Sequence, residues 1–254
     1  MDTALIYAAG SDVGRHRENN EDSAYAGAHL LAVADGMGGY AGGEVASSTV
    51  IGVLRSFDAE VPAADLSRAL GDAVSKAHAT LCRVVDEHPD LGRMGTTLTA
   101  MLWSGAQVAL AHIGDSRCYL LRGGELSQLT DDHTMDQLLG DGSGVPQLSH
   151  VLFRVLDGRQ DRTPDLTVRT GEVGDRYLLC SDGLTDAVTD AAIAEVLGSD
   201  AAPADAVRRL IDLANAAGGP DNVTCVIVDV VDGSDAAAAG PVPAVTVGAA
   251  ASPE

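Results

Sequence analysis

Four aspartates lie at the borders of apolar, strand-like runs, three of them after such a run and one just before the last. They are Asp35, Asp115, Asp182 and Asp221. If the strand ends meet at one edge of the fold, the four carboxylates converge. Because unpaired carboxylates repel one another away from water, such a cluster normally needs a cation. Oxygen ligands suit Mg²⁺ or Mn²⁺, whereas zinc prefers histidine and cysteine at spacings that this sequence lacks.

Asp35 is followed at once by glycines, in DGMGG at residues 35–39. A carboxylate at a strand end beside flexible backbone suits either a dinucleotide site or a metal site, and a third interpretation is a capping aspartate in a tight turn. The segment GMGGYA at 36–41 fits the dinucleotide pattern G-x-G-x-x-A, with Asp58 at about the right distance beyond it. Asp35 would then lie beside a bound pyrophosphate, which argues against that interpretation.

Arginines and acidic residues alternate in the stretch GRHRENNEDS at residues 14–23. The simplest interpretation is a solvated polar loop. A planar guanidinium can also bind two phosphate oxygens through parallel hydrogen bonds, so the stretch could clamp an anion beside a metal site.

Nine strand-like runs are joined in places by connections as short as Ser104-Gly105 and Gly123-Gly124. Such connections indicate hairpins, and hairpins predict antiparallel sheet. The runs cover residues 4–10, 29–34, 96–103, 106–113, 117–121, 125–130, 166–170, 176–181 and 223–231.

Helical periodicity appears in two pairs of segments, 45–57 with 66–84 and 193–197 with 203–217. The order of elements is therefore strands, two helices, many strands, two helices and one strand. This order lacks the strict alternation of a doubly wound parallel sheet. It predicts an α+β fold, a four-layer α-β-β-α sandwich of two antiparallel sheets flanked by helix pairs.

The composition excludes several kinds of partner. With 16 basic and 37 acidic residues among 254, the net charge is −21, which repels nucleic acid and anionic membranes. The four cysteines lie far apart, which is typical of a reducing compartment. No stretch is typical of a signal peptide or a membrane-spanning helix. We expect a cytoplasmic monomer that binds neither nucleic acid nor membrane.

The last 23 residues, 232–254, are rich in alanine, glycine and proline and contain no aromatic residue. Such a segment cannot form a packed core of its own. The expected organisation is one domain over residues 1–231 followed by a disordered tail over 232–254.

Six short motifs occur in an order typical of one enzyme family. They are RENNED at 17–22, DGMGG at 35–39, GTT at 95–97, GDSR at 114–117, SDGL at 181–184 and GPDNVT at 219–224. Over about residues 4–231 the sequence resembles the bacterial form of the metal-dependent serine/threonine protein phosphatases, the type 2C or PPM family. The fold of that family is the four-layer sandwich predicted above.

The resemblance implies a binuclear Mn²⁺ or Mg²⁺ site, with a possible third ion. Asp35 would bridge two ions, and the Gly36 carbonyl would bind one of them. Asp182 and Asp221 would complete the shell of the first ion, and Asp115, with Asp182, would hold the third.

The resemblance also implies roles for the polar loop. Arg17 would bind the substrate phosphate, while Glu21, Asp22 and Asn222 would support the metal site from behind. The implied activity is hydrolysis of phosphoserine and phosphothreonine on proteins by a metal-activated water. The implied partners are phosphorylated proteins, among them a serine/threonine kinase and its targets.

The sequence departs from the family pattern in two places. Met37 stands where many eukaryotic relatives carry a histidine thought to protonate the leaving group. The segment 134–153 looks shorter and richer in glycine than the flap of related bacterial enzymes. A rival hypothesis is a catalytically silent phosphopeptide-binding regulatory module of the same fold, although all the matching aspartates are present.

Overall fold

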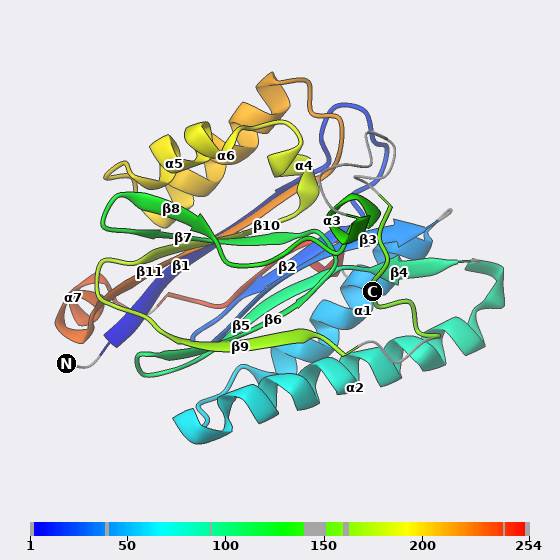
Figure 1. The fold of residues 1–254 in the computed structure, drawn as a ribbon, viewed down its shortest axis with the longest axis horizontal. Coiled ribbons are helices and arrows are strands. Elements are labelled where there is room, and N and C mark those ends of the chain that lie inside the picture. Colours follow the sequence, from blue (N-terminus) through cyan, green and yellow to red (C-terminus); the bar gives the residue numbers. More distant parts are fainter. Residues whose placement is uncertain are drawn as a thin grey trace.

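The molecule is built from four layers, two helical layers on the outside and two β-sheets between them (Figure 1). The computed structural model describes residues 3–38, 41–91, 93–139, 151–159, 163–240 and 242–251. All neighbouring strands with a described register run antiparallel. The α+β four-layer sandwich predicted from the sequence is confirmed.

The first sheet has five strands in the order β1-β11-β10-β7-β8. These strands are β1 (Thr3–Asp12), β7 (Arg117–Arg122), β8 (Glu125–Gln128), β10 (Arg176–Cys180) and β11 (Val223–Asp232). In the second sheet the order is β12-β2-β3-β5-β6-β9, with β4 paired to the end of β3. Its strands are β2 (Asp22–Ala26), β3 (Leu30–Gly38), β4 (Met94–Thr96), β5 (Leu98–Ser104), β6 (Gln107–Ile113), β9 (Asp165–Thr170) and β12 (Val245–Gly248).

One pair of long helices covers each outer face of the sandwich, as Figure 1 shows. The pair α1 (Gly42–Leu54) and α2 (Leu66–Glu87) packs on the second sheet, and the pair α5 (Asp190–Leu197) and α6 (Pro203–Ala216) packs on the first. Shorter helices lie in the connections: α3 (Met135–Leu139), α4 (Asp182–Thr185) and α7 (Gly233–Ala239). None of the helices in the described ranges is long and apolar enough to cross a membrane.

Three apolar layers hold these elements together. One lies between α1, α2 and the second sheet, one between the two sheets, and one between the first sheet and α5, α6. The sequence of β11 is continuously apolar because both of its faces are buried. Val226 and Val228 face the other sheet, while Cys225 and Ile227 face the helices. A strand buried on both faces has no polar side, so its sequence cannot alternate.

The C-terminal segment is ordered where the structure describes it, so the expected disordered tail over 232–254 is a wrong prediction there. Strand β12 pairs with β2, from Val245 opposite Ala26 to Gly248 opposite Ser23. The Ala250 N–H then donates to the Ser23 hydroxyl at 3.1 Å. The segment needs no core of its own, because main-chain hydrogen bonds to an open sheet edge and β-branched residues suffice to add a strand.

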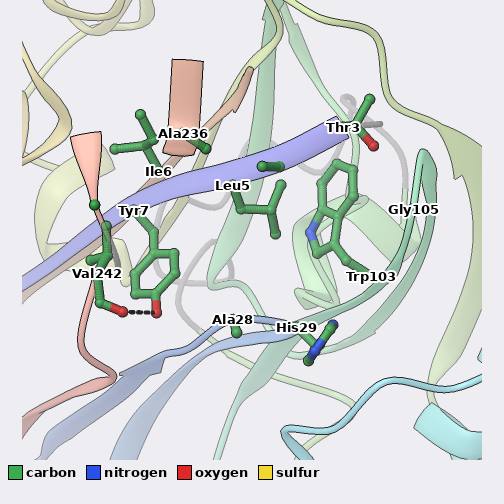
Figure 2. A pocket seen from close by; sticks show the side chains of 12 residues that line it. Thr3, Leu5, Ile6, Tyr7, Ala28, His29, Trp103, Gly105, Ala236 and Val242 are labelled. Carbon is green, nitrogen blue, oxygen red and sulfur yellow. Dashed lines mark hydrogen bonds between the residues drawn. The ribbon is translucent and has the colours of Figure 1, made fainter. Parts of the chain in front are cut away.

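A cavity of about 510 Å³ lies where β1 begins, and Figure 2 shows the side chains around it. Leu5, Tyr7 and Trp103 line it, and the Tyr7 hydroxyl donates to the Val242 carbonyl at 2.9 Å. The aspartates of interest belong to the opposite end of these strands, since β1 pairs its last residue with the start of β11. The cavity is therefore remote from the candidate functional site.

Asp58 has a structural role and does not lie beside a nucleotide-binding turn. Its carboxylate accepts hydrogen bonds from the Tyr25 hydroxyl at 2.8 Å and from the N–H groups of Ala28, His29 and Leu30 at 3.3, 2.7 and 3.0 Å. One side chain thus satisfies the main-chain donors of the turn between β2 and β3. The antiparallel pairing of β2 and β3 also excludes the parallel βαβ unit of a dinucleotide fold.

We predict that Asp58→Ala lowers the free energy of unfolding by about 2–4 kcal/mol, because the Tyr25 hydroxyl and three main-chain N–H groups lose a charged acceptor at once. The matched control is Asp72→Ala on α2, whose side chain is 65% exposed and 3.6 Å from Arg68; we expect a change within about 0.5 kcal/mol. Urea unfolding followed by circular dichroism measures both. Equal midpoints for the two variants would contradict this role.

Candidate functional site

The strand ends that carry the candidate aspartates meet at one edge of the sandwich. Asp35 lies in the last part of β3 and is directly opposite Asp22 of β2 in the sheet register. The others come from the loop after β6, the first residue of α4 and the loop before β11. They are Asp115, Asp182 and Asp221. Both sheets thus contribute carboxylates to one place.

Two threonines hold the main chain of Asp35 on both sides. Its N–H donates to the Thr97 hydroxyl at 3.0 Å, and its carbonyl accepts from the Thr96 hydroxyl and the Thr97 N–H, each at 2.9 Å. The Thr97 hydroxyl also contacts the Ser116 hydroxyl at 2.7 Å, beside Asp115. The GTT and GDSR motifs therefore fix the backbone from which two of the aspartates project.

Asp22 is fully buried behind the site, with 1% of its surface exposed. The Ser181 hydroxyl donates to its Oδ2 at 2.7 Å and itself accepts from the Thr224 N–H at 3.0 Å. Burial raises the pKa of Asp22 to about 7, with a further increase from the charges of Asp182 and Asp221, although the hydrogen bonds oppose this. Through Ser181, which directly follows β10, the residue thus joins β2 of one sheet to β11 of the other.

The other central carboxylates are electrostatically crowded. Burial raises the pKa of Asp35 well above its ordinary value, and the charges of Asp22, Asp182 and Asp115 raise it further. A hydrogen bond between the side chains of Asp35 and Asp182 acts in the same direction. Burial, with Asp182 and Asp132 nearby, raises the pKa of Asp115 to about 7. These carboxylates lie close enough to resist ionising together, which is the electrostatic condition that a bound cation relieves.

Arg17 reaches the site from the polar loop after β1. Its guanidinium donates to Asp221 Oδ2 at 2.6 Å, and this hydrogen bond raises the pKa of Arg17. The side chains are 52% and 33% exposed, so the pair lies at the rim, where a substrate can compete for the arginine. The anion-clamp interpretation of this loop is thereby consistent with the geometry.

Asn222 organises the polar loop, a role that the sequence alone could not specify. Its Oδ1 accepts from the Glu21 N–H at 2.8 Å, and its Nδ2 donates to the carbonyls of Val13 and Asn19 at 2.9 and 3.0 Å. Its own N–H donates to Asp221 Oδ1 at 2.8 Å. One buried amide thus holds the whole 13–21 loop against the start of β11, and with it Glu21, whose pKa is raised mainly by burial.

Gly36 lies where three pieces of backbone come very close together. A Cβ at this position would be 2.2 Å from the Gly43 carbonyl oxygen and 2.4 Å from that of Glu21. The Gly36 N–H donates to this Glu21 carbonyl at 3.2 Å. A side chain has no room here, which explains the glycine directly after Asp35.

The residues present fit a hard divalent cation. All candidate donors are carboxylate or carbonyl oxygens, as Mg²⁺ and Mn²⁺ require. Among the described residues, no three histidine, cysteine or acidic side chains lie close enough to form a ready-made metal cage. Such a cage is not needed, because Mg²⁺ keeps several waters and is usually held by one or two carboxylates. Crowded carboxylates with raised pKa values therefore agree with the predicted binuclear site.

A second cavity, of about 290 Å³ and lined by acidic residues, opens beside Asp115 and Asp182. Arg117 binds one of its acidic residues through three hydrogen bonds of 2.7 to 3.0 Å. Three further carboxylates line it that the sequence analysis did not select: Asp132, Asp136 and Asp186. Two of them, Asp132 and Asp136, lie in the acidic segment DDHTMD at 131–136. This local cluster of aspartates is the sequence feature that could have indicated them.

Two histidines pack behind Asp115 as structural residues. The rings of His112 and His133 lie 4.8 Å apart, and His133 Nδ1 accepts the Gly114 N–H at 3.0 Å. Burial, together with His133, lowers the pKa of His112 to about 4, so the ring is neutral at pH 7. His150 and residues 140–150 of the expected flap lie outside the described residues.

This architecture, with carboxylates gathered where two antiparallel sheets meet and an arginine at the rim, defines the class of metal-dependent PPM phosphatases. The chain belongs to the protein phosphatase 2C family, whose family model matches residues 10–218.

Its relatives are bacterial phosphatases. Mycobacterium tuberculosis serine/threonine protein phosphatase PstP is 52% identical over 235 residues, which cover 90% of this chain and 45% of PstP. The Listeria innocua serine/threonine phosphatase stp is 33% identical over 235 residues, covering 86% and 93%. A solved structure of the PstP catalytic domain in complex with two manganese ions superposes with a TM-score of 0.85 at 52% identity, covering 91% of this chain and 100% of that one.

We predict that Gly36→Ala lowers the free energy of unfolding by roughly 2 kcal/mol or more, because two carbonyl oxygens must move to admit the methyl group. The matched control is Gly52→Ala in α1, where an added Cβ meets nothing within 4 Å. That variant is expected to be more stable by about 0.5–1 kcal/mol, since alanine favours helix. Urea unfolding measures both, and a neutral Gly36→Ala would refute the close packing.

Proposed function

We propose that this chain hydrolyses phosphoserine and phosphothreonine in proteins, using a binuclear Mn²⁺ or Mg²⁺ site. The observation that carries the proposal is the convergence of Asp35, Asp182 and Asp221 from both sheets beside Arg17. The chain spans less than half of the curated mycobacterial relative that it matches, so the activity of the whole protein is part of the proposal. The catalytic domain predicted over residues 1–231 extends further, because β12 adds a strand to its second sheet.

Asp35 and the Gly36 carbonyl would hold the metal ions, together with Asp182 and Asp221, and Asp115 would hold a third. When bound, the cations supply a Lewis acid that lowers the pKa of water and polarises the phosphoryl oxygens. The support for these assignments is the mutual repulsion of the carboxylates and the all-oxygen donor set.

Arg17 binds and orients the substrate phosphate. Its exposed guanidinium can leave Asp221 and present two N–H groups to phosphate oxygens. Asn222 and Glu21 keep this loop in place, and Asp22 supports the aspartates from behind through Ser181. Met37 carries no proton to donate, so the leaving oxygen must take its proton from water or another group.

The alternative is a silent module that binds phosphopeptides without hydrolysing them. It is the weaker hypothesis, because such a module gains nothing from a cluster of carboxylates that repel a phosphate. The proposal extends to partners and location: phosphorylated proteins as substrates, including a serine/threonine kinase and its targets, acted on by a cytoplasmic monomer. A net charge of −21 supports the absence of nucleic acid and membrane partners.

We predict that hydrolysis of a phosphothreonine peptide stops after chelation and returns with Mn²⁺ or Mg²⁺. Asp35→Asn and Asp182→Asn should each lower turnover by more than ~100-fold and weaken Mn²⁺ binding, because each removes a ligand. Both substitutions should also stabilise the metal-free protein, since they relieve repulsion between carboxylates.

Phosphate release and calorimetric Mn²⁺ titration measure these effects. Asp72→Asn, on the exposed face of α2, is the control and should change neither. Full turnover in either site variant would rule out the metal assignment. Tight peptide binding without any turnover in the Mn²⁺-loaded protein would favour the silent module.

We predict that Arg17→Ala lowers kcat/KM about 10- to 100-fold, because the substrate loses a charge-assisted bidentate contact of that strength. The affinity for Mn²⁺ should stay unchanged. Arg17→Lys should restore only part of the loss, because an ammonium lacks the planar fork. The control is Arg15→Ala, an exposed arginine in the same loop. Unchanged kinetics for Arg17→Ala on both an aryl phosphate and a phosphopeptide would show that the phosphate is held elsewhere.

A further inference from the structure

A pocket of about 460 Å³ begins at Met37, two residues beyond Asp35 in β3. The end of β3 pairs with β4 beside the pocket, with Met37 opposite Gly95, and Thr96 forms a bridge with Leu156. Met37, Gly38 and Val155 are among the lining residues. A strand rises about 3.3 Å per residue, so the pocket starts roughly 7 Å from Asp35.

Two arginines line this pocket, Arg93 just before β4 and Arg159 just after the bridging segment. Both side chains are exposed, and neither guanidinium bonds to another residue within the described part of the chain. By contrast, Arg68, Arg117, Arg122, Arg154, Arg176 and Arg208 all form ion pairs with described carboxylates.

Arg15, Arg55, Arg83, Arg169 and Arg209 form no ion pair with a described carboxylate either. What distinguishes Arg93 and Arg159 is that both line one pocket beside the carboxylate cluster. One acidic residue, Asp157, also lines the pocket, but its Oδ1 accepts the Arg159 N–H at 3.0 Å and shapes the turn. The pocket therefore presents two guanidinium groups against one carboxylate, whereas the neighbouring cavity at Asp115 is strongly acidic.

We propose that Arg93 and Arg159 bind acidic side chains of the phosphoprotein substrate, close in sequence to the phosphorylated residue. The inference rests on the proposed phosphatase function and deepens it, because it names a sequence preference. The pocket begins roughly 7 Å from Asp35, about two residues of an extended peptide, so residues next to a phosphorylated side chain held at Asp35 can reach it. Guanidinium groups pair with carboxylates through parallel hydrogen bonds, and their charge offsets the repulsion that an acidic peptide meets from the rest of the surface.

The test compares two phosphothreonine peptides that differ only in the two residues on each side of the phosphothreonine, glutamate in one and glutamine in the other. We expect the Mn²⁺-loaded wild-type protein to hydrolyse the glutamate peptide with a ~3- to 10-fold higher kcat/KM, expressed mainly in KM, as two exposed ion pairs would give. The preference should shrink at high salt, because screening weakens exposed pairs.

The double variant Arg93→Ala/Arg159→Ala should lose this preference while its turnover of p-nitrophenyl phosphate stays unchanged, which also shows that it is folded. The matched control is Arg208→Ala/Arg209→Ala on α6, which removes the same charge from an outer layer and should keep the preference.

The outcomes separate this inference from the proposed function. If the wild-type protein hydrolyses the aryl phosphate but has equal kcat/KM for both peptides, the inference alone is overturned. The same holds if the preference for the glutamate peptide survives in the double variant. Absence of turnover on all three substrates in the wild type would overturn the proposed function and this inference with it.

Discussion

Mutual repulsion among carboxylates is the constraint around which this fold is organised. Burial and the charge of Asp182 raise the pKa values of Asp22, Asp35 and Asp115 at a single edge of the sandwich. A flexible chain would separate these charges, so rigid elements must hold them together. The two sheets do so from opposite sides, and the buried contact from Ser181 to Asp22 joins them at the site. The repulsion between these carboxylates destabilises the folded state, and packing in the three apolar layers must offset this cost.

Much of the architecture could be predicted because most of its strands are buried on one or both faces, β8 and β9 being the exposed exceptions. All nine predicted runs coincide with strands, and the four periodic segments with α1, α2, α5 and α6. The missed strands carry little apolar pattern: β2 reads DSAYA, β4 has three residues, and β12 lies in a stretch typical of a linker. These strands form because the neighbouring strand of a sheet offers main-chain hydrogen bonds. The local amino-acid composition does not indicate which sheet edges have unpaired main-chain groups.

The candidate site could be predicted only in part, for a similar reason. Single aspartates at strand ends were visible, since a strand border is a local feature of the sequence. The supporting contacts depend on register and loop packing between distant segments. Asn222 is 201 residues from Glu21, and Ser181 is 159 residues from Asp22. Nothing in the local sequence distinguishes such an asparagine or serine from an ordinary turn residue.

The distribution of arginines suggests how so acidic a chain can accept a phosphorylated substrate. A net charge of −21 repels anions over most of the surface. Arg17 contacts Asp221, and Arg93 and Arg159 line the pocket that begins two residues beyond Asp35, so positive charge lies near the carboxylate cluster. Ion pairs with described carboxylates offset the charge of six other arginines: Arg68, Arg117, Arg122, Arg154, Arg176 and Arg208. Local attraction at the site, against general repulsion elsewhere, favours binding in the one orientation that brings the phosphate to the aspartates.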